Sequence, residues 1–111
     1  MTWRVRLSAA AQADFSYIVD WTVERFGARQ AEVYAGVIAA ALRDLSAGPS
    51  QIGVKARDDI GKGVFALHVA RGGRKGRHFV VFRSDDAGRI IEVVRILRDA
   101  MDLRRHLPPA G

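Results

Sequence analysis

The chain opens on a regular alternation of charged and apolar residues. Trp3, Val5 and Leu7 alternate with Arg4 and Arg6, and a period of two is typical of a half-buried β-strand. The sequence therefore predicts an N-terminal strand with one face turned toward a core.

After Ser8 the apolar residues take a helical spacing. The hydroxyl of Ser8 suits the start of a helix because it can accept a hydrogen bond from the free amides of the first turn. Residues at intervals of four, three, four and four then form one apolar stripe: Ala11, Phe15, Ile18, Thr22 and Phe26. Gly27 predicts the end of this helix, since glycine readily adopts the left-handed conformation found at helix ends.

A second helix is predicted by another apolar stripe, which consists of Ala31, Ala35, Ile38, Leu42 and Leu45. Its short alanine side chains allow a close approach of the first helix, which favours an antiparallel hairpin. Pro49 ends it because proline cannot continue the hydrogen-bond ladder. We expect the core to draw on both helices and the first strand, through Val5, Leu7, Phe15, Ile18, Phe26, Ile38, Leu42 and Leu45.

The second half of the chain predicts three strands, over Val64–Ala70, His78–Ser84 and Arg89–Leu97, after an irregular connection at residues 50–63. Asp85-Asp86-Ala87-Gly88 has the turn chemistry of a hairpin between the last two. The predicted order is β-α-α-β-β-β. Helices and strands grouped in this way indicate an α+β fold, a helical hairpin packed on a mainly antiparallel sheet. We expect residues 1–111 to form a single domain.

Composition excludes several classes of protein. The chain has no cysteine, so it has no disulfide framework and no thiolate metal site. Its N-terminus lacks the apolar core of a signal peptide, and its longest uncharged apolar run, Ala35 to Leu42, is too short to span a membrane. We therefore expect a soluble cytoplasmic protein that makes no use of a membrane.

The net charge of +6 is unevenly distributed. Residues 1–50 are balanced, whereas residues 51–111 carry the whole excess of cations. Such an asymmetry predicts an acidic or polyanionic partner, the alternative being a solvated basic surface. The segment between the predicted strands Val64–Ala70 and His78–Ser84 is rich in glycine and in cations. Its cations are Arg71, Arg74, Lys75 and Arg77. It suits carboxylates or phosphates, or it is a solvated hairpin loop.

No residues with the spacing of a metal site or a catalytic centre stand out. His68, His78 and His106 lack metal-ligand spacing, and the two histidines within predicted strands favour a hydrogen-bonded structural role. Adjacent carboxylates such as Asp58-Asp59 diverge from each other and do not form an acid/base pair. We predict no metal, no cofactor and no catalytic residue.

The C-terminal residues resemble a known family. Ile96-Leu97, Met101-Asp102 and His106-Leu107, together with the predicted order of elements, are similar to the closing strand of the ParE/RelE family of small bacterial toxins. Members commonly have a histidine where this chain has Arg98. The resemblance covers nearly the whole chain and implies the same α+β fold.

The resemblance also implies a role for arginines near the end of the sheet. In the RNA-cleaving branch of the family, this region holds cations that stabilise the transition-state phosphate. We expect Arg83, Arg95 and Arg98 to cluster there. An arginine is no general acid at neutral pH. Tyr17 and Tyr34 fall on the predicted helices, so we expect neither to be placed to transfer protons at the last strand. The chain therefore resembles the ParE branch, whose members inhibit DNA gyrase, and the arginines that we expect to bind this target are Arg83, Arg95, Arg98, Arg104 and Arg105.

The implied partner is a ParD-like antitoxin with a ribbon-helix-helix domain, which would lay an amphipathic helix into a groove of the toxin and form a hetero-oligomer with it. Trp21 and Tyr34 lie off both helical stripes, so they mark a binding patch or fill the seam of the hairpin. With the four cations of residues 71–77 they are the candidate antitoxin-binding residues. Two alternatives stay open, a ribosome-dependent mRNA endoribonuclease and a non-toxic paralogue that only binds an antitoxin.

Overall fold

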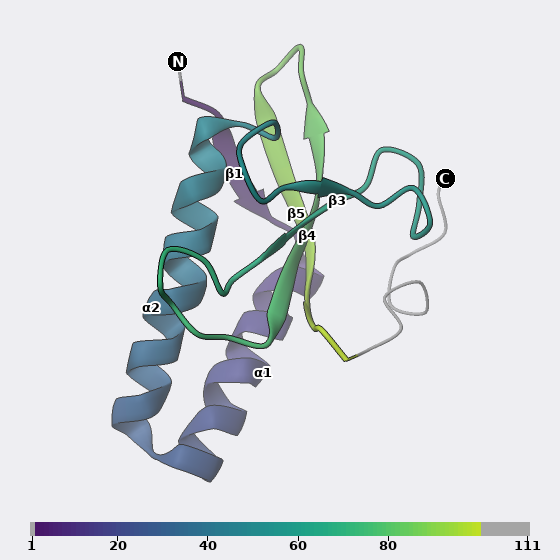
Figure 1. Cartoon of the computed structure of the whole chain (residues 1–111). Helices are drawn as coiled ribbons and strands as arrows, with labels where there is room; N and C mark the ends of the chain where they lie inside the picture. Colours follow the sequence, from purple (N-terminus) through teal and green to yellow (C-terminus); the bar gives the residue numbers. More distant parts are fainter. Residues whose placement is uncertain (1, 101–111) are drawn as a thin grey trace.

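The computed structural model describes residues 2–100 and shows two layers, a helical hairpin on one face of a five-stranded sheet (Figure 1). Its elements, in chain order, are β1 (Arg4–Leu7), α1 (Ala9–Phe26), α2 (Ala28–Asp44), the short 3-10 helix η1 (Leu45–Ala47), β2 (Lys55–Ala56), β3 (Phe65–His68), β4 (His78–Asp85) and β5 (Ile90–Arg98). The predicted α+β fold is thus confirmed.

The sheet brings the two halves of the chain together. Its strand order is β1-β5-β4-β3-β2, in which β1 runs parallel to β5 and every other pair is antiparallel. The mainly antiparallel sheet was predicted, but β2 was not, because its two residues lie within the segment expected to be irregular. The pairing of β4 with β5 contains a register shift next to Val81 and Phe82, so one residue of β5 bulges there.

The helix ends follow the local chemistry of the sequence. The Oγ of Ser8 accepts a hydrogen bond from the Ala11 amide at 3.0 Å and donates one to the carbonyl oxygen of Val94 in β5, also at 3.0 Å. Gly27 adopts a φ of +91° between the two helices, a backbone conformation that favours glycine. These two residues therefore fix where α1 starts and where the hairpin turns.

The main core lies between the helices and the sheet. Ile18, Ile38 and Leu45 are buried there as predicted. The predicted core residues Val5, Leu7, Phe15 and Leu42 are partly buried and pack against the same cluster.

One predicted core residue, Phe26, is 64% exposed, and that prediction was wrong. Figure 1 shows the reason, since the tip of the helical hairpin extends beyond the end of the sheet and leaves the last turn of α1 without a strand beneath it.

We expect Ile38→Ala to lower the free energy of unfolding by about 2–5 kcal/mol, because the side chain is fully buried between the layers and its removal leaves a cavity. Urea denaturation measures this change. Val33→Ala in the same helix is a matched control, since Val33 is 54% exposed and its truncation should change stability by less than about 0.5 kcal/mol. Equal losses in both variants would contradict the packing described here.

Candidate functional site

A groove of about 1030 Å³ opens between the helical hairpin and the ends of β4 and β5. We call it the interlayer groove. It is lined by Asp14, Tyr17, Ile18, Trp21, Thr22 and Phe26 of α1, by Gln30 and Tyr34 of α2, by residues 75–78, and by residues 95–98 of β5. It lies where the hairpin leaves the sheet.

Aromatic side chains of α1 form one wall of the interlayer groove. Trp21 and Phe26 meet edge to face with their ring centroids 6.1 Å apart. The guanidinium of Arg98 lies 5.9 Å from the Trp21 ring centroid, and that of Arg25 lies 5.1 Å from it, distances at which a cation is attracted to the ring face. Tyr17, on the same wall, is 70% exposed. Large apolar side chains thus remain open to solvent beside cations.

Polar groups at the opposite side of the groove meet at Tyr34. Its hydroxyl accepts a hydrogen bond from the backbone amide of Arg77 at 3.0 Å and lies 2.6 Å from the Nδ1 atom of His78. Tyr34 belongs to α2, whereas the other two belong to the β3–β4 connection and the start of β4. One hydroxyl therefore joins three segments, and His78 has the hydrogen bond that we expected of a histidine in a strand.

Burial keeps both members of this pair neutral. It lowers the pKa of His78 to about 4, an effect that the positive charge of Arg98 strengthens. The pKa of Tyr34 is raised, again mainly by burial. At neutral pH the imidazole and the phenol are therefore both uncharged.

Arg95 is held by an acidic partner at the base of the groove. Its Nε and Nη2 atoms donate to the two carboxylate oxygens of Asp14 at 2.7 and 2.9 Å, and the Ile96 amide donates to the same carboxylate at 2.9 Å. The bidentate pair raises the pKa of Arg95 further. The charge of Arg95 is thus compensated within the protein, while the pair ties α1 to β5.

The predicted cluster of three arginines is not formed. Arg83 lies opposite Glu92 in the β4–β5 pairing, whereas Arg98 lies opposite His78 at the other end of the hairpin. Five residues of a strand span about 16 Å, so Arg83 is remote from the groove. The prediction was wrong because Arg83 and Arg98 both lie near the C-terminal end of a strand. Neighbouring antiparallel strands run in opposite directions, so their C-terminal ends lie far apart, at opposite ends of the strand pair.

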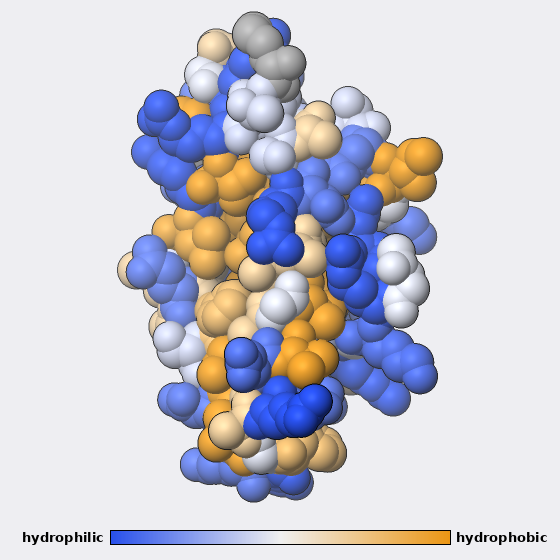
Figure 2. Space-filling view, turned by 90° about the vertical axis from the view of Figure 1, so that its left-hand side faces the viewer, coloured by the Kyte–Doolittle hydropathy of each residue, from blue (hydrophilic) through white to orange (hydrophobic). Residues whose placement is uncertain are grey.

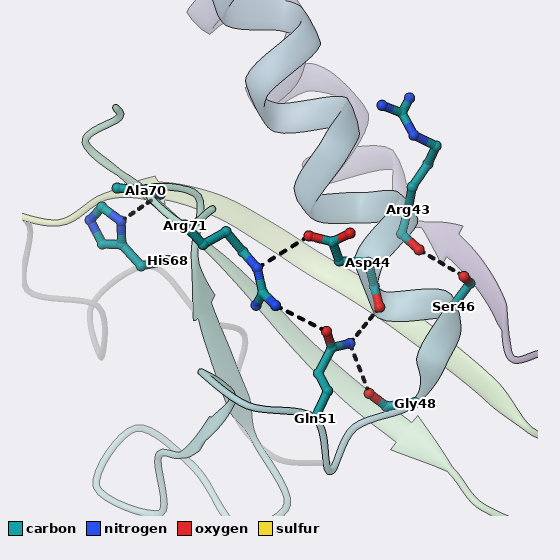
Figure 3. A network of polar contacts seen from close by, with 8 residues as sticks. All are labelled: Arg43, Asp44, Ser46, Gly48, Gln51, His68, Ala70 and Arg71. Carbon is teal, nitrogen blue, oxygen red and sulfur yellow. Dashed lines mark hydrogen bonds and ion pairs between the residues drawn. The ribbon is translucent and has the colours of Figure 1, made fainter. Parts of the chain in front are cut away.

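The basic segment 71–77 divides between two environments. Figure 3 shows Arg71 turned toward α2, where its Nε contacts Asp44 at 3.1 Å and its Nη2 donates to the Gln51 side chain at 3.2 Å. Gln51 in turn donates to the Gly48 carbonyl at 3.1 Å. Arg71 therefore fastens the connection after α2, while Lys75 and Arg77 line the groove.

Several predicted site residues thus converge on the groove, namely Trp21, Tyr34, Lys75, Arg77, Arg95 and Arg98. Arg71, Arg74 and Arg83 do not line it, and Arg104 and Arg105 lie outside the described residues. Tyr17 and Tyr34 stand in the same groove as Arg98, so the inference that their place on helices separates them from this region was wrong. No pattern in the sequence indicates the Tyr34–His78 contact, which joins residues 44 positions apart.

Figure 2 shows the face on the α2 side, where apolar residues gather along the middle and hydrophilic residues both interrupt and border them. Within residues 2–100, no set of three or more metal-ligating side chains comes together. No helix in this part of the chain is long and apolar enough to span a membrane.

Known proteins are similar to this chain in sequence and in fold. Residues 5–103 match the family described as ParE toxin of type II toxin-antitoxin system, parDE. A protein named Toxin ParE1, from two strains of Mycobacterium tuberculosis, is 37% identical to this chain over 107 residues, which cover 96% of this chain and 100% of the relative.

Two solved structures share the fold at lower identity. One is a chromosomal ParDE TA system from P. aeruginosa, with a TM-score of 0.64 and 23% identity, covering 86% of this chain and 95% of that one. The other is the toxin–antitoxin complex RelBE2 from Mycobacterium tuberculosis, with a TM-score of 0.60 and 21% identity, covering 88% of this chain and 99% of that one.

We expect acid to destabilise the protein through His78. Because its pKa in the folded protein is about 4 and about 6.5 in an unfolded chain, the unfolded chain binds more protons between these values. The free energy of unfolding should therefore fall as the pH is lowered from about 6.5 to 4. Urea denaturation across this range should show a smaller fall for His78→Gln than for the unsubstituted protein. Parallel curves for the two proteins would refute this assignment.

Proposed function

This chain belongs to the ParE toxin family of type II toxin–antitoxin systems, and we propose that it inhibits DNA gyrase and is neutralised by a ParD-like antitoxin in the cytoplasm. The observation that carries the antitoxin part is the interlayer groove, in which an exposed aromatic wall faces a cationic end. The gyrase part rests on family membership and on the chemistry of the groove.

An amphipathic helix is the partner that the groove suits best. Exposed apolar surface bordered by polar residues marks protein-binding sites, and a groove between elements receives the apolar face of a helix in a common mode of peptide recognition. Trp21 and Phe26 supply the apolar surface, and Tyr17 extends it. This arrangement supports Trp21 as an antitoxin-binding residue.

The cations that we propose for this partner overlap only in part with those expected from the sequence. Arg71 is paired with Asp44, and Arg95 with Asp14, so these two arginines act mainly within the protein. Lys75, Arg77 and Arg98 line the groove and can meet acidic residues along the rim of a bound helix. We assign Arg98 to the antitoxin-binding surface for this reason, beside its candidate role toward gyrase.

The chemistry of the groove favours a non-enzymatic toxin over a ribonuclease. General acid–base catalysis works best with groups whose pKa lies near the operating pH. Burial moves the pKa of His78 well below neutrality and raises that of Tyr34, and Arg83 is too remote to join the other arginines. His78 and Tyr34 are therefore poorly suited to act as the proton donor and acceptor of RNA cleavage at neutral pH.

We expect the product of the neighbouring antitoxin gene to bind this chain with sub-micromolar affinity, measured by calorimetry. Trp21→Ala should weaken binding by about 2 kcal/mol or more, the cost of truncating a central aromatic anchor. Ile52→Ala is the control, because Ile52 is apolar and 92% exposed but does not line the groove. A lack of binding by the unsubstituted chain at micromolar concentrations would contradict the proposed antitoxin.

We expect the purified protein to block supercoiling by DNA gyrase or to trap cleaved gyrase–DNA complexes. Reversing two C-terminal cations, Arg104→Glu with Arg105→Glu, should weaken this effect because arginines suit carboxylates and DNA phosphates. Arg6→Glu with Arg29→Glu changes the net charge equally at two exposed positions and serves as the control. Cleavage of mRNA on ribosomes, with supercoiling unaffected, would favour the endoribonuclease alternative.

A further inference from the structure

The hydroxyl of Tyr34 holds together the groups at the polar end of the interlayer groove. We propose that Tyr34 is a positioning residue that presents His78 and Arg98 to one carboxylate of the antitoxin. In this arrangement the Nε2–H of His78 and the guanidinium of Arg98 donate to that carboxylate. The inference rests on the proposed antitoxin and adds the chemistry by which the groove recognises it.

The proposed role of Tyr34 requires one tautomer of His78. The phenol oxygen accepts from the Arg77 amide at 3.0 Å and lies 2.6 Å from the Nδ1 atom of His78, and in the proposed arrangement the phenol donates its own proton to this nitrogen. A neutral imidazole that accepts at Nδ1 carries its proton on Nε2. Nε2 has no hydrogen-bond partner within residues 2–100 and is not sealed from solvent. It is therefore an available donor in the groove.

Burial is the main reason why the His78 ring stays neutral, and Arg98 adds to this effect and places a cation beside the ring. Arg98 lies directly opposite His78 in the β4–β5 pairing, and its charge opposes protonation of the ring. Asp99 and Asp14 act in the opposite sense, but Asp99 is engaged with His68 at 3.0 Å and Asp14 with Arg95 at 2.7 Å. A neutral N–H beside a guanidinium is suited to a carboxylate.

Gly76 provides a second, independent sign that this end of the groove is built around Tyr34. A Cβ atom at this position would collide with the Val69 side chain and crowd the Tyr34 hydroxyl. The backbone of the β3–β4 connection therefore presses directly against the tyrosine. Lys75 and Arg77 flank this contact and line the groove on either side of it.

The combination of surfaces favours an acidic helix as the occupant. The groove places aromatic side chains and cations within one cavity, so its ligand needs a bulky apolar group close to a negative charge. The amphipathic segment of an antitoxin offers both on adjacent turns of a helix. The net charge of +6 on this chain would speed the encounter with such a segment.

The test compares two hydroxyl groups, one at the groove and one away from it. Tyr34→Phe removes the bridging hydroxyl, whereas Ser46→Ala removes a hydroxyl that donates to the Arg43 carbonyl at 2.7 Å and does not line the groove. Calorimetry with the product of the neighbouring antitoxin gene should show an affinity about tenfold lower for Tyr34→Phe, the effect of impairing a hydrogen bond to a charged group. Ser46→Ala should bind within about twofold of the unsubstituted chain.

Two further measurements separate positioning from a general loss of structure. In the free protein, nitrogen NMR of the imidazole should show His78 protonated at Nε2, and Tyr34→Phe should change this signature while the thermal transition stays cooperative. On the antitoxin side, each Asp or Glu of the bound segment is replaced in turn by its amide. One of these replacements should abolish the difference between Tyr34→Phe and the unsubstituted chain, which identifies the bound carboxylate.

The outcomes distinguish this inference from the proposed function. Equal affinities for Tyr34→Phe and Ser46→Ala, an Nδ1–H tautomer, or no coupled carboxylate would overturn the role of Tyr34 while leaving the antitoxin in place. Failure of the unsubstituted chain to bind the antitoxin would remove both. Arg98→Gln, at an exposed position, provides a second variant that should lose affinity even if Tyr34→Phe fails to fold. The inference would also be overturned if a single-stranded oligoribonucleotide bound tightly and Tyr34→Phe weakened this binding but not the binding of the antitoxin.

Discussion

The Asp14 carboxylate is the interaction on which the arrangement of the two layers depends. It accepts two hydrogen bonds from the Arg95 guanidinium and one from the Ile96 amide, so one side chain joins α1 to both the backbone and a side chain of β5. Ser8, the N-cap of α1, adds a bond to the Val94 carbonyl. Both ties lie at the N-cap or in the first half of α1, whereas the second half of the helix extends past the end of the sheet beside the interlayer groove.

The β-bulge in β5 makes this attachment compatible with a filled core. In a regular strand, successive side chains point to opposite faces. The register shift beside Val81 and Phe82 inserts one extra residue into β5, and such bulges re-aim the side chains next to them. Val94 packs with Val81 in the smaller apolar cluster, whereas Ile96 belongs to the main core. Arg95 between them reaches Asp14, and the sheet keeps apolar residues on both faces.

Local chemistry in the sequence was sufficient for the elements but not for the site. The cap at Ser8, the turn at Gly27 and the α+β layout follow from neighbouring residues, and all three were predicted. Phe26 was misplaced because a helical stripe does not tell how far a helix extends beyond its sheet. The contact between Tyr34 and His78 depends on register and on the packing of α2 against β4, which no periodicity within one element encodes. Acidic partners for particular arginines are unpredictable for the same reason.

Neutral donors and compensated charges suit recognition better than catalysis. A proton-transfer site needs groups that change charge near the working pH, but burial drives the pKa values of His78 and Tyr34 away from neutrality in opposite directions. Such a pair keeps the same protons throughout the physiological range, so its donors point in fixed directions. Preorganised donors lower the entropic cost of binding a partner. The burial that makes this pair a poor acid and base is therefore compatible with the role that we propose for it, which is to present fixed donors to a charged side chain.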